Sequence, residues 1–477
     1  MKKIAWLIAL SATYAVAPAQ KTKPEIIKAI DGKSAQYSTI AKQIWNYAEV
    51  GYKEVKSSAL LQETLASEGF KIEKGVAGIP TAFIASYGSG KPVIAILGEF
   101  DALPGISQDA APELKPVPGK TAGHACGHHL FGTASTLAAI EVKDWLIANK
   151  KSGTIRLYGT PAEEGGSGKV YMVRDGLFKD VDAVLHWHPS SENSAEAEGS
   201  LSNKSGKFRF YGIASHASGS PERGRSALDA VEAMDAMVNM LREHVSQETR
   251  IHYVITRGGE APNVVPAFAE VYYYVRHPKR EEVKSTWERV VKAAEGAALG
   301  TETRMEYEVT GGVYNMLPNE ALGRIMDANL RTVGGYTLTK EEQEFGAKIQ
   351  QTFTGPKIPK LESTAEIVPF RVSETGILGS TDVADISWVV PTVGLGTATW
   401  VPGTAAHSWQ AVAAGGMSIG FKGMTMAAKT IALSAIDLFE KPAVIETAWK
   451  ELKTRRGETF TYEALLGNRK PALNYRD

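Results

Sequence analysis

Cysteine is nearly absent from this sequence. Cys126 is the only cysteine in 477 residues, which excludes an intrachain disulfide as a source of stability. A free cysteine is usually a small buried hydrophobic side chain. The neighbours of Cys126 are not apolar, however, because it lies in the segment His124-Ala-Cys-Gly-His-His129. The single thiol therefore needs a chemical explanation.

Net charge is absent as well. Lysine plus arginine number 53, and so do aspartate plus glutamate. A chain without net charge has no long-range field that would attract nucleic acid or an anionic membrane. We therefore expect neither as a partner, and a small neutral or mixed-charge ligand fits better.

The sequence also lacks an N-terminal hydrophobic run long enough to span a bilayer. The apolar run from Ile4 to Ala17 is shorter than the roughly 20 residues that a membrane anchor needs. It follows Lys2 and Lys3 and precedes Ala17-Pro-Ala19, which has the form of a signal-peptidase site. We predict that residues 1–19 are a cleaved signal peptide and that the protein is exported, to the periplasm or outside the cell.

Apolar runs that end in polar residues indicate an α/β fold. Val93 to Leu97 precedes Gly-Glu-Phe-Asp, Ile155 to Tyr158 precedes Gly-Thr-Pro-Ala-Glu-Glu, and Ala183 to Leu185 precedes His-Trp-His-Pro. These runs are typical of buried strands, and helical patterns separate them, as at Leu130 to Ile147 and Val170 to Leu177. Ligands of such sheets bind beyond the carboxyl ends of the strands, where the polar segments fall.

The pattern changes from about Gly206 onwards. Strand, helix, strand, strand, helix and strand follow one another up to Val309, an order that predicts a ferredoxin-like α+β unit. We expect it to be inserted into the first domain, which resumes after Pro318 and includes a strand at Thr392 to Gly396 and a helix at Phe421 to Leu438. The predicted organisation is a catalytic domain in two parts (residues 20–204 and 317–440), an inserted domain (205–316) and an extension (441–477) that holds one helical pattern, Val444 to Lys453.

Potential metal ligands gather at the polar ends of these strands. The segment from His124 to His129 offers a thiolate and imidazoles, which suit zinc-like ions. Glu163-Glu164 offers carboxylates, and alternation along His186-Trp187-His188 directs both histidines to one face. The residues leave open which of these two histidines is a ligand. The number of potential ligands in these segments exceeds the three or four protein ligands of one zinc ion, which favours a site with two metals. The two ions of such sites are about 3.5–4 Å apart.

Six strings of the sequence resemble the aminoacylase/carboxypeptidase family of two-metal metallopeptidases, in its amidohydrolase branch that acts on aminobenzoyl-glutamate and indole-acetyl-amino acids. They run in family order across residues 40–440. The strings are Gly98-Glu-Phe-Asp-Ala-Leu-Pro104, His124-Ala-Cys-Gly-His128, Pro161-Ala-Glu-Glu-Gly165, Leu185-His-Trp-His-Pro189, Gly379-Ser-Thr-Asp382 and His407-Ser-Trp409.

The resemblance implies a role for each matching residue. The implied ligands of two zinc or manganese ions are Cys126, His128, Glu164, His188 and His407. Glu163 would be the general base, Asp101 would orient the site, and the inserted domain would form a homodimer and cover the active site. His216 would help to hold the oxyanion, within its own subunit or across the dimer, and Asn263 and Arg276 would bind a substrate carboxylate. His129 departs from the branch, which usually has Asp or Asn there.

The expected reaction is amide hydrolysis of N-acyl or N-aroyl amino acids, with dipeptides as the alternative. The metals would polarise the carbonyl and acidify a bound water, whose proton Glu163 would take and return to the leaving amine.

Three other interpretations compete with amide hydrolysis. Gly416-Met-Ser-Ile-Gly420 fits the nucleophile elbow of serine hydrolases, but no histidine follows His407, as that fold requires. Gly88-Ser-Gly-Lys91 lacks the spacing of a phosphate-binding loop and is followed by Pro92. A catalytically silent binding protein is the third alternative, and loss of Glu163 or of the ligands would have indicated it.

Overall fold

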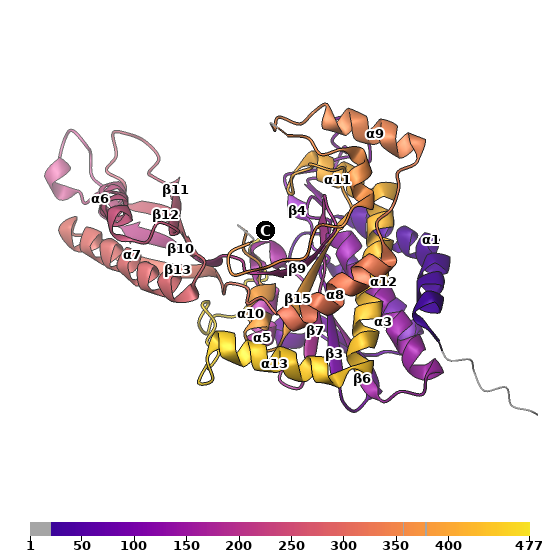
Figure 1. Ribbon diagram of the computed structural model, residues 1–477. Coiled ribbons are helices and arrows are strands. Elements are labelled where there is room, and N and C mark those ends of the chain that lie inside the picture. The colour runs from indigo at the N-terminus through magenta and orange to yellow at the C-terminus, as the bar shows by residue number, and fades with distance from the viewer. Residues whose placement is uncertain (1–20, 356, 377–378) are drawn as a thin grey trace, which may run out of the picture.

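A nine-stranded mixed sheet organises the larger part of the molecule (Figure 1). The computed structural model describes residues 21–355, 357–376 and 379–477. The strand order is β1-β2-β6-β3-β7-β15-β9-β14, and β8 pairs with β15. The strands are β1 (Lys71–Lys74), β2 (Phe83–Ser89), β3 (Val93–Gly98), β6 (Gly153–Gly159), β7 (Ala183–Leu185), β8 (His188–Ser190), β9 (Ser194–Glu198), β14 (Val372–Ser373) and β15 (Thr392–Ala398). A separate two-stranded ribbon joins β4 (Leu103–Pro104) and β5 (Ala122–Gly123).

The centre of the sheet is parallel. Strands β6, β3, β7 and β15 are neighbours, and each pairs with the next in parallel. All residues of β3 and of β15 are buried, which explains their uninterrupted apolar or small-residue character. Because parallel strands end at the same edge of a sheet, the polar segments that follow them meet there.

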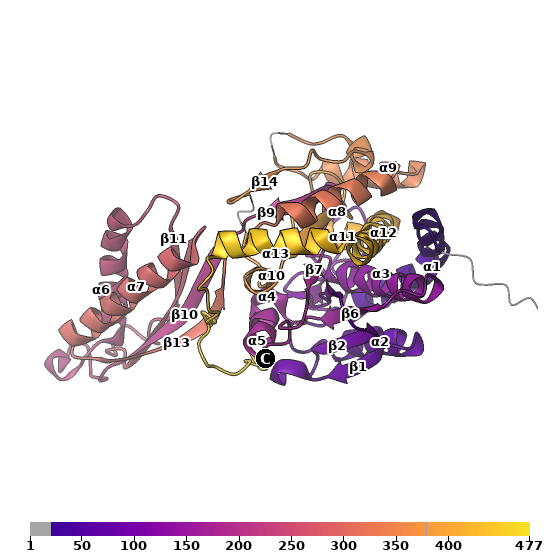
Figure 2. The same ribbon diagram turned by 60° about the horizontal axis from the view of Figure 1, so that its bottom comes forward.

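Helices cover the faces of this sheet. Helix α3 lies against β3 and β6, α12 lies against β15, and α1 packs on both helices from outside. Figures 1 and 2 show α5 and α10 on the side of the sheet that faces the inserted domain. The helices of this part are α1 (Lys23–Tyr47), α2 (Val55–Ser67), α3 (His128–Ala148), α4 (Glu163–Gly166), α5 (Gly168–Arg174), α8 (Glu320–Val333), α9 (Lys340–Gln350), α10 (Val383–Ser387), α11 (Trp409–Gly415), α12 (Ser418–Glu440) and α13 (Pro442–Arg456). Short 3-10 turns cover Val76–Gly78 and Leu361–Ala365.

The inserted domain has a sheet and a hydrophobic core of its own. Its four antiparallel strands have the order β11-β12-β10-β13, with α6 and α7 packed together on the sheet. The core includes Phe208, Val271, Tyr273 and Trp287. The elements are β10 (Ser202–Tyr211), α6 (Ala227–Leu241), β11 (Arg250–Arg257), β12 (Phe268–His277), α7 (Arg280–Gly300) and β13 (Arg304–Val313), with 3-10 turns at Pro221–Arg223 and Arg242–His244. The predicted ferredoxin-like order is confirmed.

The chain after α13 forms no further helix or strand among the described residues, but it is not a detached tail. Figure 2 shows it running from α13 past β10 and β13 and back to α5. Its residues Leu465 and Leu466 are buried, and Leu465 contacts Gly312 at the end of β13. The segment thus lies along the connection between the two domains.

The predicted signal peptide, residues 1–19, lies outside the described residues. Within the described ranges, no helix combines the length and the apolar character needed to cross a membrane.

A close approach of backbone to backbone fixes α3 against β3, and it can be tested. A Cβ on Gly132 of α3 would lie 2.7 Å from the backbone oxygen of Glu99, which follows β3. We expect Gly132→Ala to lower the free energy of unfolding by about 1–3 kcal/mol in denaturant titrations. Gly32 of α1 has no atom within 4 Å of the same position, so Gly32→Ala should instead stabilise by about 0.5–1 kcal/mol. Equal changes in the free energy of unfolding for the two substitutions would contradict the close packing of α3 against β3.

Candidate metal centre and active site

The carboxyl edge of the parallel strands brings the predicted site residues together. Glu99 and Asp101 follow β3, the pair Glu163 and Glu164 follows β6 in α4, and His188 follows β7. The start of α3 adds Cys126 and His128, which Gly127 joins with a φ of 76°, a value that favours glycine. A Cβ at Gly127 would also lie 2.6 Å from Pro189. His407 comes from the loop between β15 and α11.

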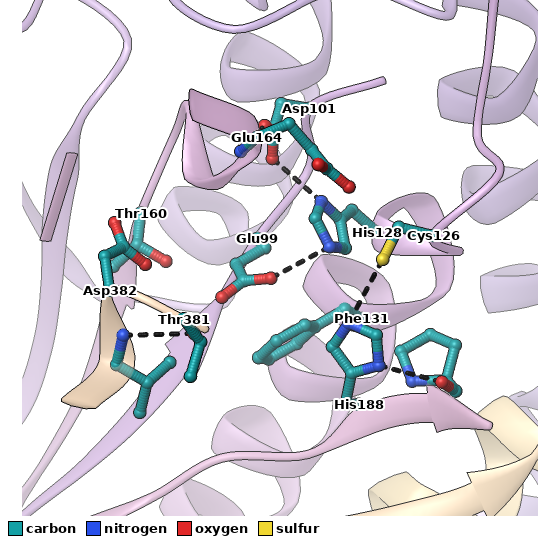
Figure 3. Close-up of polar contacts among 12 residues, drawn as sticks. Glu99, Asp101, Cys126, His128, Phe131, Thr160, Glu164, His188, Thr381 and Asp382 are labelled. Atoms are coloured by element: carbon teal, nitrogen blue, oxygen red, sulfur yellow. Dashed lines mark hydrogen bonds and ion pairs between the residues drawn. The ribbon is translucent and has the colours of Figure 1, made fainter. Parts of the chain in front are cut away.

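The five predicted ligands form two groups that share Cys126. One group is Cys126, His128 and His188, and the other is Cys126, Glu164 and His407. Within each group the potential ligand atoms all lie within 4.8 Å of one another. Figure 3 shows the first group with the Cys126 thiol directed at the His188 ring. The Sγ to Nε2 distance is 3.4 Å.

Asp101 holds two of these residues. One carboxylate oxygen lies 2.9 Å from His128 Nδ1, and the other accepts the Glu164 backbone N–H at 2.9 Å. Burial raises the pKa of Asp101, but the charge of His128 and the hydrogen bonds from His128 and the Glu164 backbone together outweigh it, so the net shift is downward. With Nδ1 bonded to Asp101, His128 presents Nε2 to the cluster. This is the arrangement expected of an orienting carboxylate.

His188 and His186 have different surroundings. His188 Nδ1 bonds to the Pro189 carbonyl at 2.8 Å, which makes Nδ1 the N–H donor and leaves Nε2 as the atom that faces Cys126. His186 belongs to none of the groups of potential ligands among the described residues. Trp187 points the other way, is fully buried and donates its indole N–H to the Phe131 carbonyl. The structure therefore brings His188, and not His186, to the cluster.

The His407 loop is tied to the Cys126 loop by its backbone. The His407 N–H donates to the Ala125 carbonyl at 3.0 Å, and His407 has a φ of 60°, which is unusual for a residue other than glycine. Its Nε2 lies 3.1 Å from Glu164 Oε1. The adjacent Glu164 carboxylate raises the pKa of His407. Such a constrained backbone is typical of functional sites.

The donor set fits divalent metal ions. Glu164 Oε1 and His128 Nε2 are buried and have no well-aligned hydrogen bond to any described residue. Burial raises the pKa of the Cys126 thiol, so its thiolate requires a cation beside it. Unsatisfied buried donors and acceptors are destabilising unless a ligand binds them. Thiolate, imidazole and carboxylate together suit zinc or manganese.

Sequence reasoning missed a buried ion network beneath the cluster. Glu99 lies 3.1 Å from His128 Nε2 and 2.6 Å from the Lys169 ammonium, which in turn bonds to Asp382 at 2.7 Å. All of these side chains are buried. Burial would lower the pKa of Lys169, but Asp382 and Glu99 raise it overall. The strings Gly-Glu-Phe-Asp and Gly-Ser-Thr-Asp contained Glu99 and Asp382, but only the fold places Lys169 between them.

Glu163 lies beside this network and lines the cavity. It forms a third group of potential ligand atoms with Glu99 and His128. Burial, followed by the charges of Glu99, Glu164 and Asp382, raises the pKa of Glu163 well above its usual range. In the absence of a cation its carboxylate therefore binds a proton more readily than that of an ordinary exposed glutamate.

The loop that carries both glutamates is strained. Ala162 and Ser167, on either side of α4, have φ values of 57°, in the left-handed region. Such residues persist only where surrounding contacts hold them. Tyr52 donates to the Gly166 carbonyl, and two residues of the C-terminal segment donate to the Glu164 carbonyl: Tyr475 at 3.0 Å and Arg476 at 2.6 Å. Nothing in the sequence pattern connected residues 457–477 with the site.

A cavity of about 780 Å³ opens between the two domains beside the cluster. The site residues and Arg276 of β12 line it together, and Arg276 Nε is buried without a hydrogen bond to any described residue. Asn263 and His216 do not line it within the same chain. They lie in one exposed part of the inserted domain, where Ala217 N–H donates to the Asn263 carbonyl. The predicted pair Asn263 and Arg276 is therefore not brought together within a single chain.

His129 is turned away from the cluster. Its Nε2 lies 2.9 Å from the Gly415 carbonyl, and its ring packs on His124 at 4.8 Å. Burial lowers the pKa of His129 well below its usual range. This departure from the branch pattern leaves the groups of potential ligands unchanged.

Comparison with known proteins agrees with this geometry. Residues 199–302 match the peptidase dimerisation domain of the M20 family. The chain is 42% identical to one of the subunits of the p-aminobenzoyl-glutamate hydrolase of Escherichia coli (strain K12), over 89% of this chain and 93% of that protein. The chain belongs to the M20 peptidase family. It is thus a hydrolase of amide bonds, and the predicted fold class and enzyme class are confirmed.

Further M20 members cover nearly the whole chain. The Xaa-Arg dipeptidase of Mus musculus is 29% identical over 94% of this chain and 95% of its own length. A solved dinuclear metal-binding peptidase of the M20 family from Bacillus subtilis has a TM-score of 0.57 at 18% identity, over 86% of this chain and 99% of that one.

Cys126 is the shared member of both ligand groups, so its loss should affect metal binding most directly. Loss of a residue that only orients a metal ligand typically weakens metal affinity by about 10–100-fold. Cys126 would bind the metal directly, so we expect Cys126→Ser to weaken metal affinity by more than about 100-fold. Elemental analysis after dialysis measures the bound metal. His129→Asn, in the same segment, should keep its metal. Unchanged metal content in Cys126→Ser would contradict the assignment.

The C-terminal contacts should matter for turnover. We expect Arg476→Ala combined with Tyr475→Phe to lower kcat by up to about 30-fold, since the two hydrogen bonds contribute about 1 kcal/mol each to holding the Glu163-Glu164 loop. KM should change little. Asn474→Ala, which removes an exposed neighbouring side chain, is the matched control. Steady-state kinetics with unaltered kcat in the double variant would show that the contact is dispensable.

Proposed function

We propose that this M20 hydrolase cleaves the amide bond of N-acyl or N-aroyl amino acids of the aminobenzoyl-glutamate kind. The observation that carries the proposal is a single cavity that Glu163, Arg276 and four of the five predicted ligands line together. Those four ligands are Cys126, Glu164, His188 and His407. The 42% identity to the p-aminobenzoyl-glutamate hydrolase protein of Escherichia coli supports the same substrate class.

Two divalent metal ions, zinc or manganese, are part of the proposal. Cys126, His128, Glu164, His188 and His407 would hold them, because the structure supplies these residues as two groups with a common thiol. When bound, the ions polarise the substrate carbonyl and acidify water. The dinuclear member from Bacillus subtilis supports a pair of ions in this fold.

Glu163 is the proposed general base. Its carboxylate belongs to the group with Glu99 and His128 and lines the cavity, so it is free to take a proton from water and deliver it to the leaving nitrogen. Asp101 keeps His128 and the Glu164 backbone in place through its two hydrogen bonds. Lys169 forms ion pairs with Glu99 and Asp382, so these two carboxylates near Glu163 are paired with a positive charge.

The substrate carboxylate would bind to Arg276. A buried guanidinium nitrogen without a partner among the described residues is a strong donor for an incoming anion. We infer that the inserted domain forms a homodimer and that His216 and Asn263 reach the cavity of the other protomer, where His216 would stabilise the oxyanion. The dimerisation-domain match supports this assembly. A complex with a different protein is the alternative, because the relative from Escherichia coli is named as one subunit of a hydrolase.

Dipeptide hydrolysis is the second candidate function. The Xaa-Arg dipeptidase of Mus musculus matches over 94% of the chain, so both substrate classes occur among relatives of full length. A catalytically silent binding protein is disfavoured because the ligand groups and Glu163 are all present. We further propose export through the N-terminal segment with Lys2, Lys3 and the apolar run Ile4 to Ala17.

The proposal is tested with the metal-loaded protein and a panel of N-aroyl amino acids, N-acyl amino acids and dipeptides. We expect hydrolysis of the first two classes and loss of all activity after chelation, whereas a binding protein has no activity to lose. Reconstitution with each metal in turn identifies the ion that supports turnover.

Glu163→Gln tests the role of Glu163 as general base independently of metal binding. We expect kcat to fall by about 10²–10⁴-fold, which is the typical contribution of general base catalysis, with both metals retained. Glu113→Gln, at an exposed position, should behave as the wild type. A kcat near the wild-type value in Glu163→Gln would remove Glu163 from this role.

A further inference from the structure

One wall of the cavity takes no part in the mechanism described above. It is formed by Glu196 and Glu198 of β9, by His186 after β7, and by Gly394 of β15. The cavity is continuous from this wall to the ligand groups and Arg276. With about 780 Å³, it is large enough for a whole small ligand, so this wall contacts a part of the substrate other than the scissile amide.

Glu196 is an unpaired carboxylate in this wall. Its side chain makes no hydrogen bond or ion pair with any residue in the described ranges, whereas its neighbour Glu198 is paired with Arg371. Burial, followed by the charges of Glu198 and Glu192, raises the pKa of Glu196 to about 7. A half-buried carboxylate without a protein partner is expected where a ligand supplies the missing donor.

Glycines on β15 make room for the Glu196 and His186 side chains. A Cβ on Gly394 would lie 3.0 Å from Glu196 Oε2 and 2.9 Å from His186 Nε2. A Cβ on Gly396 would lie 2.8 Å from Glu196 Oε1. Both carboxylate oxygens and His186 Nε2 therefore lie close to bare backbone of β15, and a side chain at position 394 would displace Glu196 and His186 from where they line the cavity.

His186 shares this space and is also without a partner. It is only 6% exposed, and its ring makes no hydrogen bond to a described residue. A carboxylate accepts hydrogen bonds, and so does the Nε2 atom of a neutral histidine when its hydrogen is on Nδ1. The chemical group that satisfies both is a nitrogen that carries several N–H donors.

We propose that Glu196 and His186 form a subsite that accepts hydrogen bonds from an N–H-bearing group of the substrate, remote from the scissile amide. The inference rests on the proposed function and deepens it. Arg276 would take the carboxylate of the substrate, and this subsite would take its donor nitrogen. An aromatic amine on the acyl group and the guanidinium of a basic dipeptide have this chemistry in common, and both kinds of substrate occur in the names of relatives.

Matched substrate pairs test the subsite. p-Aminobenzoyl-glutamate and benzoyl-glutamate differ only in the amine, and alanyl-arginine and alanyl-norleucine differ in the guanidinium. We expect the wild type to prefer the N–H-bearing member of at least one pair by about 10- to 100-fold in kcat/KM, as for a hydrogen bond to a charged group. The pair that shows the preference identifies the source of the nitrogen.

Substitution of Glu196 should remove that preference. Glu196→Leu, of similar volume, should reduce it to less than about 3-fold while hydrolysis of the member without the N–H group is kept. Glu196→Gln retains one acceptor oxygen, so its substrate preference should lie between that of the wild type and that of Glu196→Leu. Glu198→Gln is the matched control because Glu198 already pairs with Arg371. Thermal unfolding should show no loss of stability in Glu196→Leu, since the variant removes a half-buried carboxyl group that has no partner among the described residues.

Measurements of substrate binding test the subsite independently of the proposed hydrolysis. Calorimetric titration of metal-loaded Glu163→Gln with each pair measures the subsite without turnover, with and without Glu196→Leu. Equal affinities within both pairs, or a preference that survives Glu196→Leu, would overturn the subsite even if the wild type hydrolyses these substrates. A binding preference that depends on Glu196 would support the subsite even if the proposed hydrolysis failed.

Discussion

The Asp101 carboxylate is the contact on which the rest of the site depends. Through its two oxygens it joins three elements: the end of β3, where it lies itself, His128 at the start of α3, and the Glu164 backbone in α4. A buried carboxylate that accepts two hydrogen bonds is stable only if both donors are in place. The three segments therefore take their mutual positions from one side chain, and the ligand groups follow from those positions.

The chain surrounds this contact with constraints of different kinds. Gly132 lets α3 approach the backbone after β3, and the Lys169 ion network supports Glu99 from below. The strained loop of the two glutamates is held from the other side by Tyr52, Tyr475 and Arg476. Because the last two come from the C-terminal segment that also packs along the domain connection, the geometry of the catalytic loop and the position of the inserted domain are linked through one stretch of chain.

The cavity combines groups whose capacity for hydrogen bonding or metal binding the described residues do not fully use. Arg276 presents a donor, Glu196 presents acceptors, and the thiol and imidazoles between them present metal ligands. A protein interior normally satisfies such groups internally. Their coincidence in one space between two domains is the physical reason to assign the space to a substrate with a carboxylate, an amide and a nitrogen donor.

The sequence by itself determined the parallel core, the ferredoxin-like insertion and the short strings that hold the candidate ligands, because buried strands and polar strand ends leave local patterns. It could not choose between His186 and His188, since alternation sends both to one face. Only the tertiary structure decided this, through the Nδ1 bond of His188 to Pro189 and its approach to Cys126. It also decided that Lys169, Tyr475 and Arg476 belong to the site and that Glu196 stands unpaired, because contacts between residues far apart in the chain leave no periodic trace in the sequence.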